Sequence, residues 1–229
     1  MSVSDEFTLD RRQVRRAFER AAPGYDAAAV LQREVGARLL ERLELTTLAP
    51  ARILDLGCGT GQGARALLQH YPKAEVVAAD VAFGMLREAR HRRNWFRRAR
   101  LLCADAQALP LKTMSFDLIY CNLVLQWCDD LDRTFLELRR LLRPHGLLLF
   151  SSFGPDTLKE LRAAWRQVDS FTHVNRFIDM HDMGDALIRA GFAEPVMDVE
   201  QVVLTYADTR ALMQDLKHIG AHNVKIGRA

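Results

Sequence analysis

The sequence of 229 residues predicts an α/β fold with a mainly parallel sheet and helices on both of its faces. Two observations support this prediction. From residue 52 onward, short apolar runs typical of buried strands alternate with segments that have helical spacing. The first apolar run ends in a glycine-rich turn, as expected where an α/β domain joins its first strand to its first helix. A chain of this length can bury one good-sized core.

The elements are expected in a regular order. Residues 1–47 form an N-terminal helical cap, because apolar residues recur at helical spacing from 10 to 47 with a break at Pro23 and Gly24. Residues 48–229 form the main domain, in which 153–178 interrupt the alternation as a lid insertion after the fifth strand. Strands are expected at 52–56, 75–80, 100–103, 116–121, 146–152 and 196–206. Helices are expected at 62–70, 82–92, 131–142, 156–168, 180–190 and 209–219.

The composition disfavours several classes of protein. Hydrophobic residues make up 49% of the chain and charged residues 27%, as in ordinary globular domains. No apolar run approaches the roughly 20 residues that a membrane helix needs, and residues 1–10 are polar and acidic, unlike a signal peptide. The four cysteines form no CxxC pair, which favours reduced thiols and a cytoplasmic location.

The most informative run, from Ile53 to Gly61, reads ILDLGCGTG. Its glycines at 57, 59 and 61 let the backbone turn sharply and approach a ligand with no Cβ in the way. The helix that follows points its positive N-terminal end at whatever lies above the loop. Asp80 follows Gly61 by nineteen residues and ends the second apolar run, a position from which a carboxylate can accept hydrogen bonds from ribose hydroxyls. These features predict a site for an adenosine-containing cofactor.

Four polar residues each lie near the end of a successive expected strand: Asp55, Asp80, Asp105 and Asn122. Parallel strands end at one edge of a sheet, and ligands bind in the crevice at that edge. We therefore expect these residues to converge on one site. For Asp105, ordinary turn chemistry before Pro110 is the alternative interpretation.

The glycine spacing indicates which cofactor is bound. A dinucleotide-binding loop reads GxGxxG, whereas this chain reads GxGxG with Asp55 two residues before the first glycine. This form resembles motif I of the class I S-adenosylmethionine-dependent methyltransferases. The resemblance implies a Rossmann-like sheet of six to seven strands and S-adenosyl-L-methionine as cofactor, with Asp105 and the backbone N–H of Ala106 at the adenine. The cofactor-binding residues that it implies are Asp55, Gly57, Gly59, Gly61, Asp80, Val81, Met85, Asp105, Ala106 and Asn122.

Further clusters resemble a narrower family, the malonyl-acyl carrier protein O-methyltransferases of biotin synthesis. With Tyr25 and His173, they read FERAA at 18–22, LQR at 31–33, NL at 122–123, QWC at 126–128, NRF at 175–177, LK at 216–217 and IGA at 219–221. The similarity extends over roughly residues 12 to 228. It implies methyl transfer to the free carboxylate of malonyl-acyl carrier protein at the start of pimeloyl and biotin synthesis.

A carboxylate is already ionised at neutral pH, so such a reaction needs no general base. The enzyme has to hold the carboxylate in line with the methyl group and exclude water. Arg176 is the leading candidate for the clamp, because a guanidinium binds a carboxylate with two hydrogen bonds. A surface ion pair with Asp179 is the alternative. Tyr25 and Gln126 are the other catalytic candidates, and the candidate substrate-binding residues are Trp127, His173, Asn175 and Lys217.

Other functions are still open at this point. The LQW run at 125–127 also resembles trans-aconitate methyltransferase, which acts on a small free acid. Related chains serve as assembly factors of mitochondrial complex I, although no Arg- and Ser-rich transit segment precedes Leu9. The Pro-Pro-aromatic tetrad of amine methyltransferases is absent after the fourth expected strand, which disfavours nucleic acid. A metal is not expected, because no compact zinc spacing joins His173, His181, His218 and His222.

The stretch Arg87–Arg100 contains seven arginines, although the net charge of the whole chain is only +3. A solvated helix and loop face is one interpretation. Acyl carrier proteins are strongly acidic, so the resemblance also implies a docking surface for malonyl-acyl carrier protein here, with an affinity that falls as salt is added.

The end of the chain departs from the class I pattern, in which an antiparallel seventh strand usually completes the sheet. No convincing strand follows Tyr206. Either the sheet has six strands or the sequence is part of a longer protein.

Replacing Arg176 with alanine should abolish methylation of malonyl-acyl carrier protein and leave cofactor binding nearly intact, because the clamp contacts only the substrate. Turnover and the affinity for S-adenosylhomocysteine are the two quantities to measure. Unchanged turnover would exclude Arg176 as the clamp.

Overall fold

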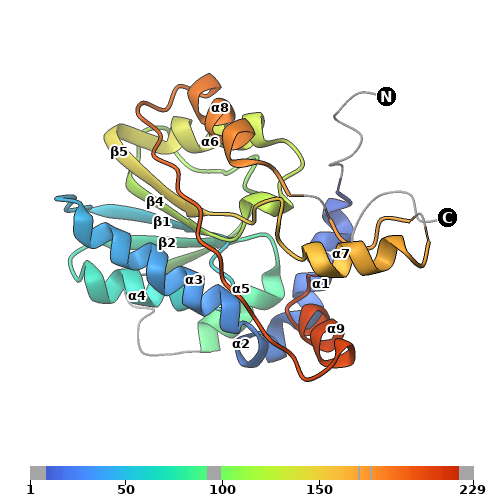
Figure 1. The fold of residues 1–229 in the computed structure, drawn as a ribbon. Helices are drawn as coiled ribbons and strands as arrows, with labels where there is room; N and C mark the ends of the chain where they lie inside the picture. Colours follow the sequence, from blue (N-terminus) through green and yellow to red (C-terminus); the bar gives the residue numbers. More distant parts are fainter. Residues whose placement is uncertain (1–8, 92–98, 170, 176, 222–229) are drawn as a thin grey trace.

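The computed structural model describes residues 9–91, 99–169, 171–175 and 177–221. One sheet of five parallel strands runs through the molecule in the order β3-β2-β1-β4-β5 (Figure 1). The strands are β1 (Arg52–Leu56), β2 (Glu75–Asp80), β3 (Ala99–Cys103), β4 (Phe116–Asn122) and β5 (Leu142–Ser151). The α-helices are α1 (Arg11–Ala21), α2 (Tyr25–Ala28), α3 (Val30–Glu41), α4 (Gln62–His70), α5 (Phe83–His91), α6 (Leu131–Leu141), α7 (Lys159–Arg166), α8 (Met180–Arg189) and α9 (Thr209–His218). The 3-10 turns are η2 (Ala22–Gly24), η3 (Arg42–Leu45) and η4 (Leu125–Trp127).

The strand order reverses at β1. The chain moves outward from β1 to β2 and β3, and then returns to β4 on the other side of β1. The loops after β1 and β4 therefore leave the sheet in opposite directions and open a crevice above the carboxyl end of β1. This is the edge at which the polar strand ends were expected to meet.

Alternate strand residues bury against helices on opposite faces of the sheet. One face packs on α3, α4 and α5, and the other packs on α6 and α8 (Figure 1). The first core contains Ile53, Val76, Leu118, Leu39, Leu67 and Leu86, and the second contains Leu54, Val77, Ile119, Phe135, Leu138 and Met183. Burial on both faces explains why the strands read as continuous apolar runs. The predicted α/β fold is confirmed.

The expected strand at 196–206 is wrong, and so is the expected count of six to seven strands for the described part of the chain. This segment has no ladder partner among the described residues and runs past α3 towards α9 (Figure 1). Ion pairs hold it there: Arg42 binds Asp198 at 2.7 Å and Glu200 at 2.5 Å. Its valines at 196, 199 and 203 are exposed, so the alternating pattern that suggested a strand does not bury a face.

Helix α1 caps helix α5 from outside. The carboxylate of Glu19 accepts hydrogen bonds from the backbone N–H groups of Phe83 at 2.8 Å and Gly84 at 2.7 Å. These donors belong to the first turn of α5 and have no partner inside their own helix. A Cβ at position 84 would lie 2.7 Å from Glu19 Oε2, so glycine is needed for this close approach. The contact ties the N-terminal helices to the sheet domain.

Replacing Glu19 with alanine should lower the free energy of unfolding by about 1–2 kcal/mol, because the α5 cap and its favourable charge at the helix N-terminus are lost together. Urea denaturation measures this change. The Glu44→Ala variant is a matched control: Glu44 is exposed, and its loss should change stability by less than about 0.5 kcal/mol. Equal stabilities of the two variants would contradict the capping role.

Candidate active site

A pocket opens at the carboxyl ends of β1, β2, β3 and β4, where the sequence predicts a cofactor. Its wall contains ten of the predicted site residues: Tyr25, Gly57, Gly59, Asp80, Val81, Met85, Asp105, Ala106, Asn122 and Trp127. Asp55 is not in the wall but lies beneath the glycine turn and is 2% exposed. Gly61 begins α4 behind the turn. The convergence expected from the strand ends is therefore present in the structure, and we call this the strand-end pocket.

The glycine turn depends on the absence of side chains. All three glycines have left-handed backbones, with φ of 67° at Gly57, 53° at Gly59 and 84° at Gly61. A Cβ at Gly57 would lie 2.1 Å from Val124 Cγ2, on the loop after β4. At Gly59 a Cβ would meet nothing closer than Tyr25 Cε1 at 3.9 Å. The turn thus packs tightly against the β4 loop at its first glycine and presents bare backbone to the open pocket at its second.

Asp80 joins the loops after β1 and β2. Its Oδ2 accepts a hydrogen bond from Gly59 N at 2.9 Å and its Oδ1 accepts one from Ala82 N at 2.8 Å. Burial raises the pKa of Asp80 to about 6; the two N–H donors oppose this shift and the nearby Glu19 carboxylate adds to it. A carboxylate has lone pairs beyond these two bonds, so Asp80 can still accept from a ligand in the pocket.

The buried groups below and beside Asp80 have raised pKa values for the same reason. Burial raises the pKa of Asp55 to about 7, against a hydrogen bond from Ala64 N, and the charge of Asp80 adds to the rise. Asp55 Oδ2 is buried and has no hydrogen-bond partner among the described residues. Burial, followed by the charge of Asp80, also raises the pKa of Tyr25 well above its usual range, so its phenol is a neutral donor at physiological pH.

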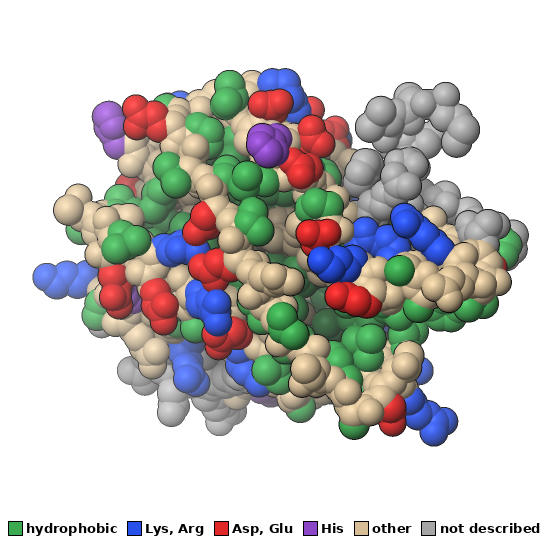
Figure 2. All heavy atoms as spheres, in the orientation of Figure 1, with side chains coloured by type: hydrophobic (Ala, Val, Ile, Leu, Met, Phe, Trp, Pro, Cys, Tyr) green, Lys and Arg blue, Asp and Glu red, His purple; other side chains and the backbone are tan. Residues whose placement is uncertain are grey.

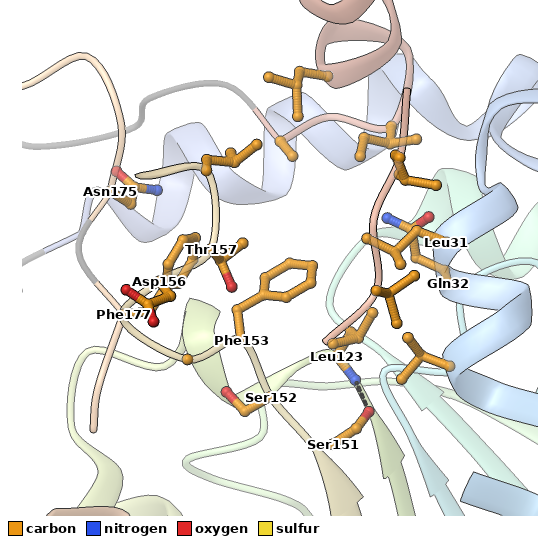
Figure 3. A pocket seen from close by; sticks show the side chains of 18 of the residues that line it. Leu31, Gln32, Leu123, Ser151, Ser152, Phe153, Asp156, Thr157, Asn175 and Phe177 are labelled. Carbon is orange, nitrogen blue, oxygen red and sulfur yellow. Dashed lines mark hydrogen bonds between the residues drawn. The ribbon is translucent and has the colours of Figure 1, made fainter. Parts of the chain in front are cut away.

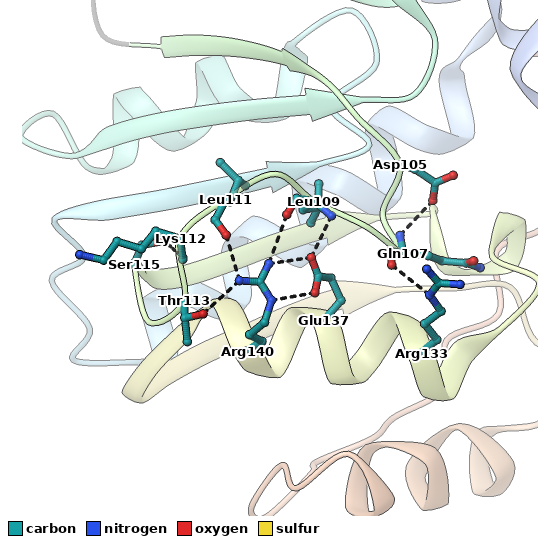
Figure 4. A network of polar contacts seen from close by, with 10 residues as sticks. All are labelled: Asp105, Gln107, Leu109, Leu111, Lys112, Thr113, Ser115, Arg133, Glu137 and Arg140. Carbon is teal, nitrogen blue, oxygen red and sulfur yellow. Dashed lines mark hydrogen bonds and ion pairs between the residues drawn. The ribbon is translucent and has the colours of Figure 1, made fainter.

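The loop that carries Asp105 is held from below by α6 (Figure 4). Glu137 accepts from Leu109 N at 2.8 Å, and Arg140 donates to the carbonyls of Leu109 at 3.2 Å and Leu111 at 2.9 Å. Within the loop, Asp105 Oδ1 accepts from Gln107 N at 2.9 Å. Its other oxygen forms an ion pair with Arg11 of α1. This network keeps Asp105 and Ala106 at the far end of the pocket from the glycine turn.

The N-terminal segment closes the pocket from above. Phe18 meets the ring of Trp127 edge-on, with centroids 5.3 Å apart. Asp26 Oδ1 accepts hydrogen bonds from Thr60 Oγ1 at 2.5 Å and Gln62 Nε2 at 2.7 Å, on the glycine turn and the start of α4. The segment from 11 to 26 therefore covers the strand-end pocket, and a ligand that enters from this side requires the segment to move away.

A larger open groove adjoins the strand-end pocket. Leu123 and Trp127 line both spaces, so the two meet at the loop after β4. The predicted substrate-binding residues Trp127, His173, Asn175 and Lys217 all line this groove. Figure 3 shows Asn175, Phe177 and Asp156 on one side of it, facing Leu31 and Gln32 of α3. In the space-filling view, apolar side chains gather around a hollow in this face (Figure 2).

Three predicted site residues need separate comment. Gln126 lines neither space: its Nε2 donates to Leu123 O at 2.7 Å, within its own turn. The side chain of Asn122 is also engaged, donating to Gln32 O at 2.9 Å and accepting from Ser151 Oγ at 2.8 Å. Arg176 lies outside the described residues.

His173 is held by its neighbours in the segment after β5. Its Nε2 lies 2.8 Å from Asp169 Oδ1, and its ring stacks on Trp165 with centroids 3.9 Å apart. The Asp169 pKa is lowered, first by this hydrogen bond. Sequence reasoning identified His173 but neither of these partners.

The residues that sequence reasoning did not assign to the site come mostly from α1 and the loop after β4. They are Arg11, Val14, Phe18 and Glu19, with Asp26, Leu123 and Val124. A helix at the N-terminus was expected, but the spacing of its apolar residues does not show which loop of the sheet domain the helix covers. The arginine-rich start of α1 was the feature of the sequence that could have drawn attention to this helix.

The comparisons with known proteins agree with this geometry. A model named "Methyltransferase domain" matches residues 54–150. The chain is 55% identical to a malonyl-[acyl-carrier protein] O-methyltransferase of Gallionella capsiferriformans, over 98% of this chain and 79% of the relative. It is 53% identical to the protein of that name from Laribacter hongkongensis, over 99% and 79%. The chain belongs to the malonyl-[acyl-carrier protein] O-methyltransferase family.

Solved structures support the same fold at lower identity. A phosphoethanolamine N-methyltransferase 2 of Haemonchus contortus, in complex with S-adenosyl-L-methionine, matches with a TM-score of 0.56 and 23% identity, over 80% of this chain and 41% of that chain. As a member of the malonyl-[acyl-carrier protein] O-methyltransferase family, the chain uses S-adenosyl-L-methionine as its cofactor.

The strand-end pocket suits this cofactor. It has a carboxylate acceptor at each end, Asp80 by the glycine turn and Asp105 on the loop after β3. Gly59 lines the same pocket, and a Cβ there would meet nothing closer than 3.9 Å. Beneath the turn, the buried Oδ2 of Asp55 has no hydrogen-bond partner among the described residues.

Binding of S-adenosylhomocysteine should weaken as the pH falls from about 8 to about 5, by roughly tenfold. Below the Asp80 pKa of about 6, protonation removes the acceptor that the ribose hydroxyls need. Calorimetric titration over this pH range measures the effect. The Asp80→Asn variant should bind weakly at every pH and lose the dependence, whereas Asp105→Asn should keep it. A dependence that persists in Asp80→Asn and disappears in Asp55→Asn would assign the titration to Asp55 instead.

Proposed function

We propose that this protein transfers a methyl group from S-adenosyl-L-methionine to the free carboxylate of malonyl-acyl carrier protein, the first step of a pimeloyl and biotin pathway. The observation that carries the proposal is the junction of two spaces at Leu123 and Trp127. The strand-end pocket suits the cofactor, and the larger groove beside it suits a malonyl group delivered on a carrier protein. The names of relatives at more than half identity support the choice of substrate.

The bound cofactor supplies an electrophilic methyl group. The substrate carboxylate is already ionised, so the chain has no proton to remove and its task is to position the oxygen and exclude water. Trp127 lies where the two spaces meet and is held by Phe18, which makes it the wall along which the carboxylate approaches. Tyr25 also lines the pocket and offers a neutral phenol donor there.

The carboxylate clamp is assigned to the segment after β5. His173 and Asn175 of this segment line the groove together with Lys217 of α9, and Arg176 directly follows Asn175 in the sequence. Asn175 Oδ1 is buried with no partner among the described residues, so the side chain has unused hydrogen-bonding capacity. We propose that residues 153–178 act as the lid that covers the bound malonyl group.

We further propose that the carrier protein docks on the basic face of Arg87–Arg100. Within its described part, Arg87, Arg90 and Arg100 are exposed; Arg92, Arg93, Arg97 and Arg98 lie outside the described residues. Attraction between this face and an acidic partner would raise the association rate and weaken with added salt.

Incubation with labelled S-adenosyl-L-methionine tests the function. Malonyl-acyl carrier protein should gain one methyl ester by mass spectrometry and be preferred over malonyl-CoA, whereas trans-aconitate should not react. Neutralising Arg92, Arg93, Arg97 and Arg98 should raise the KM for the carrier-protein substrate and leave that for malonyl-CoA unchanged. Faster methylation of trans-aconitate would overturn the substrate assignment, and an equal effect of the neutralisation on both malonyl substrates would remove the docking face.

A further inference from the structure

Helix α1 has two faces of opposite character. Its five arginines and single glutamate give it a net charge of +4 within eleven residues. Val14, Ala17 and Ala21 are buried on the side that faces the domain. Arg12, Arg15, Arg16 and Arg20 are all exposed. This exposed set, which we call the α1 arginine face, is not needed to build the strand-end pocket.

The charges of this face are available to a partner. Among the described residues, Arg15, Arg16 and Arg20 take part in no ion pair. The acidic groups of the same segment have other tasks: Asp10 caps α1 through Arg12 N and Gln13 N, and Glu19 caps α5. Several unneutralised guanidinium groups on one face repel one another unless an anionic surface covers them.

The face lies next to the site. Arg11, at the start of the same helix, reaches Asp105 at the far end of the strand-end pocket. Burial raises the pKa of the Cys103 thiol at the carboxyl end of β3, and the positive charge of Arg15 opposes this rise. A macromolecule bound to the α1 arginine face would therefore lie beside the same edge of the sheet as the pocket.

The face is also continuous with α5. Glu19 joins α1 to the first turn of α5, and Arg87 and Arg90 are exposed on the following turns. The two helices thus form one basic surface. Helix α1 is the part of it that also contributes residues to the pocket, namely Arg11 and Phe18.

We propose that the α1 arginine face is the main docking surface for an acidic carrier protein that presents the thioester substrate. This inference rests on the proposed function for the identity of the partner, and on charge complementarity for the surface. Arginine is well suited to this role, because its guanidinium binds carboxylates with two hydrogen bonds and stays charged at all relevant pH values. Since α1 also closes the strand-end pocket, docking takes place on the element that covers the cofactor.

A charge reversal tests the proposal through binding as well as turnover. The Arg12→Glu, Arg15→Glu, Arg16→Glu triple variant should bind carrier protein without a malonyl group at least tenfold more weakly than wild type, measured by fluorescence anisotropy at low salt. Wild-type affinity should fall as salt is added. The KM for malonyl-acyl carrier protein should rise by a similar factor, with kcat and the KM for malonyl-CoA unchanged.

The control variant reverses Arg65, Lys73 and Lys112, which are exposed on α4 and in the loops that precede β2 and β4. It should bind the carrier protein within about twofold of wild type, since long-range attraction is screened beyond roughly 10 Å. The melting temperature and the affinity for S-adenosylhomocysteine of the triple variant report whether α1 still packs in place.

The two proposals fail in different ways. Carrier protein that binds through α1 but is not methylated would refute the function and leave the docking surface in place. Methylation with an unchanged KM in the triple variant, or equal weakening in the control, would refute the docking surface alone. Tighter binding of a DNA duplex or of anionic vesicles, in competition with the carrier protein, would assign the face to that partner instead.

Discussion

The carboxylate of Asp80 connects two loops through donors that are 23 residues apart in the chain, Gly59 N and Ala82 N. By accepting from Gly59 N and Ala82 N it fixes the glycine turn after β1 against the start of α5 after β2. Without this carboxylate, Gly59 N and Ala82 N would lose their protein acceptor, and the backbone bond from Cys58 N to Ala79 O would still tie the turn to β2. With both loops fixed, the strand-end pocket has a rigid floor against which its other walls pack.

This arrangement keeps negative charge in a place that water cannot reach easily. Burial raises the pKa of both Asp80 and Asp55, so part of the folding free energy is used to hold acidic groups where they are poorly solvated. Such unfavourable burial is typical of functional sites, where a ligand rather than the protein satisfies the group. A cationic cofactor bound beside these groups would relieve this cost.

The N-terminal segment connects this floor to the substrate side. Phe18 positions Trp127 at the junction of pocket and groove, Glu19 caps α5, and Asp26 holds the glycine turn. The buried side of α1 is apolar and closes the pocket, while its outer side is cationic and exposed. One helix therefore joins an apolar side that packs on the domain to a cationic side that is exposed.

Much of this molecule followed from residues close together in the chain. The ILDLGCGTG run, Asp80 at the next strand end and the alternation of apolar runs determined the parallel sheet, the pocket edge and the cofactor class. These features are local, because a strand, a turn and a helix start depend on backbone rules that operate over a few residues.

The failures concern contacts between distant parts of the chain. The segment 196–206 has a strand-like pattern, but Arg38 and Arg42 on α3 bind its acidic residues and it joins no ladder. Asn122 has a side chain suited to ligand binding, yet Gln32 O of α3 and Ser151 Oγ of β5 engage it. The sequence also did not predict that α1 lies over the pocket, although the arginines of α1 can be read directly from it. The sequence determined which groups can bind a methyl donor; only tertiary packing decided which of them are free to do so, because hydrogen bonds and ion pairs between distant segments compete for the same donors and acceptors.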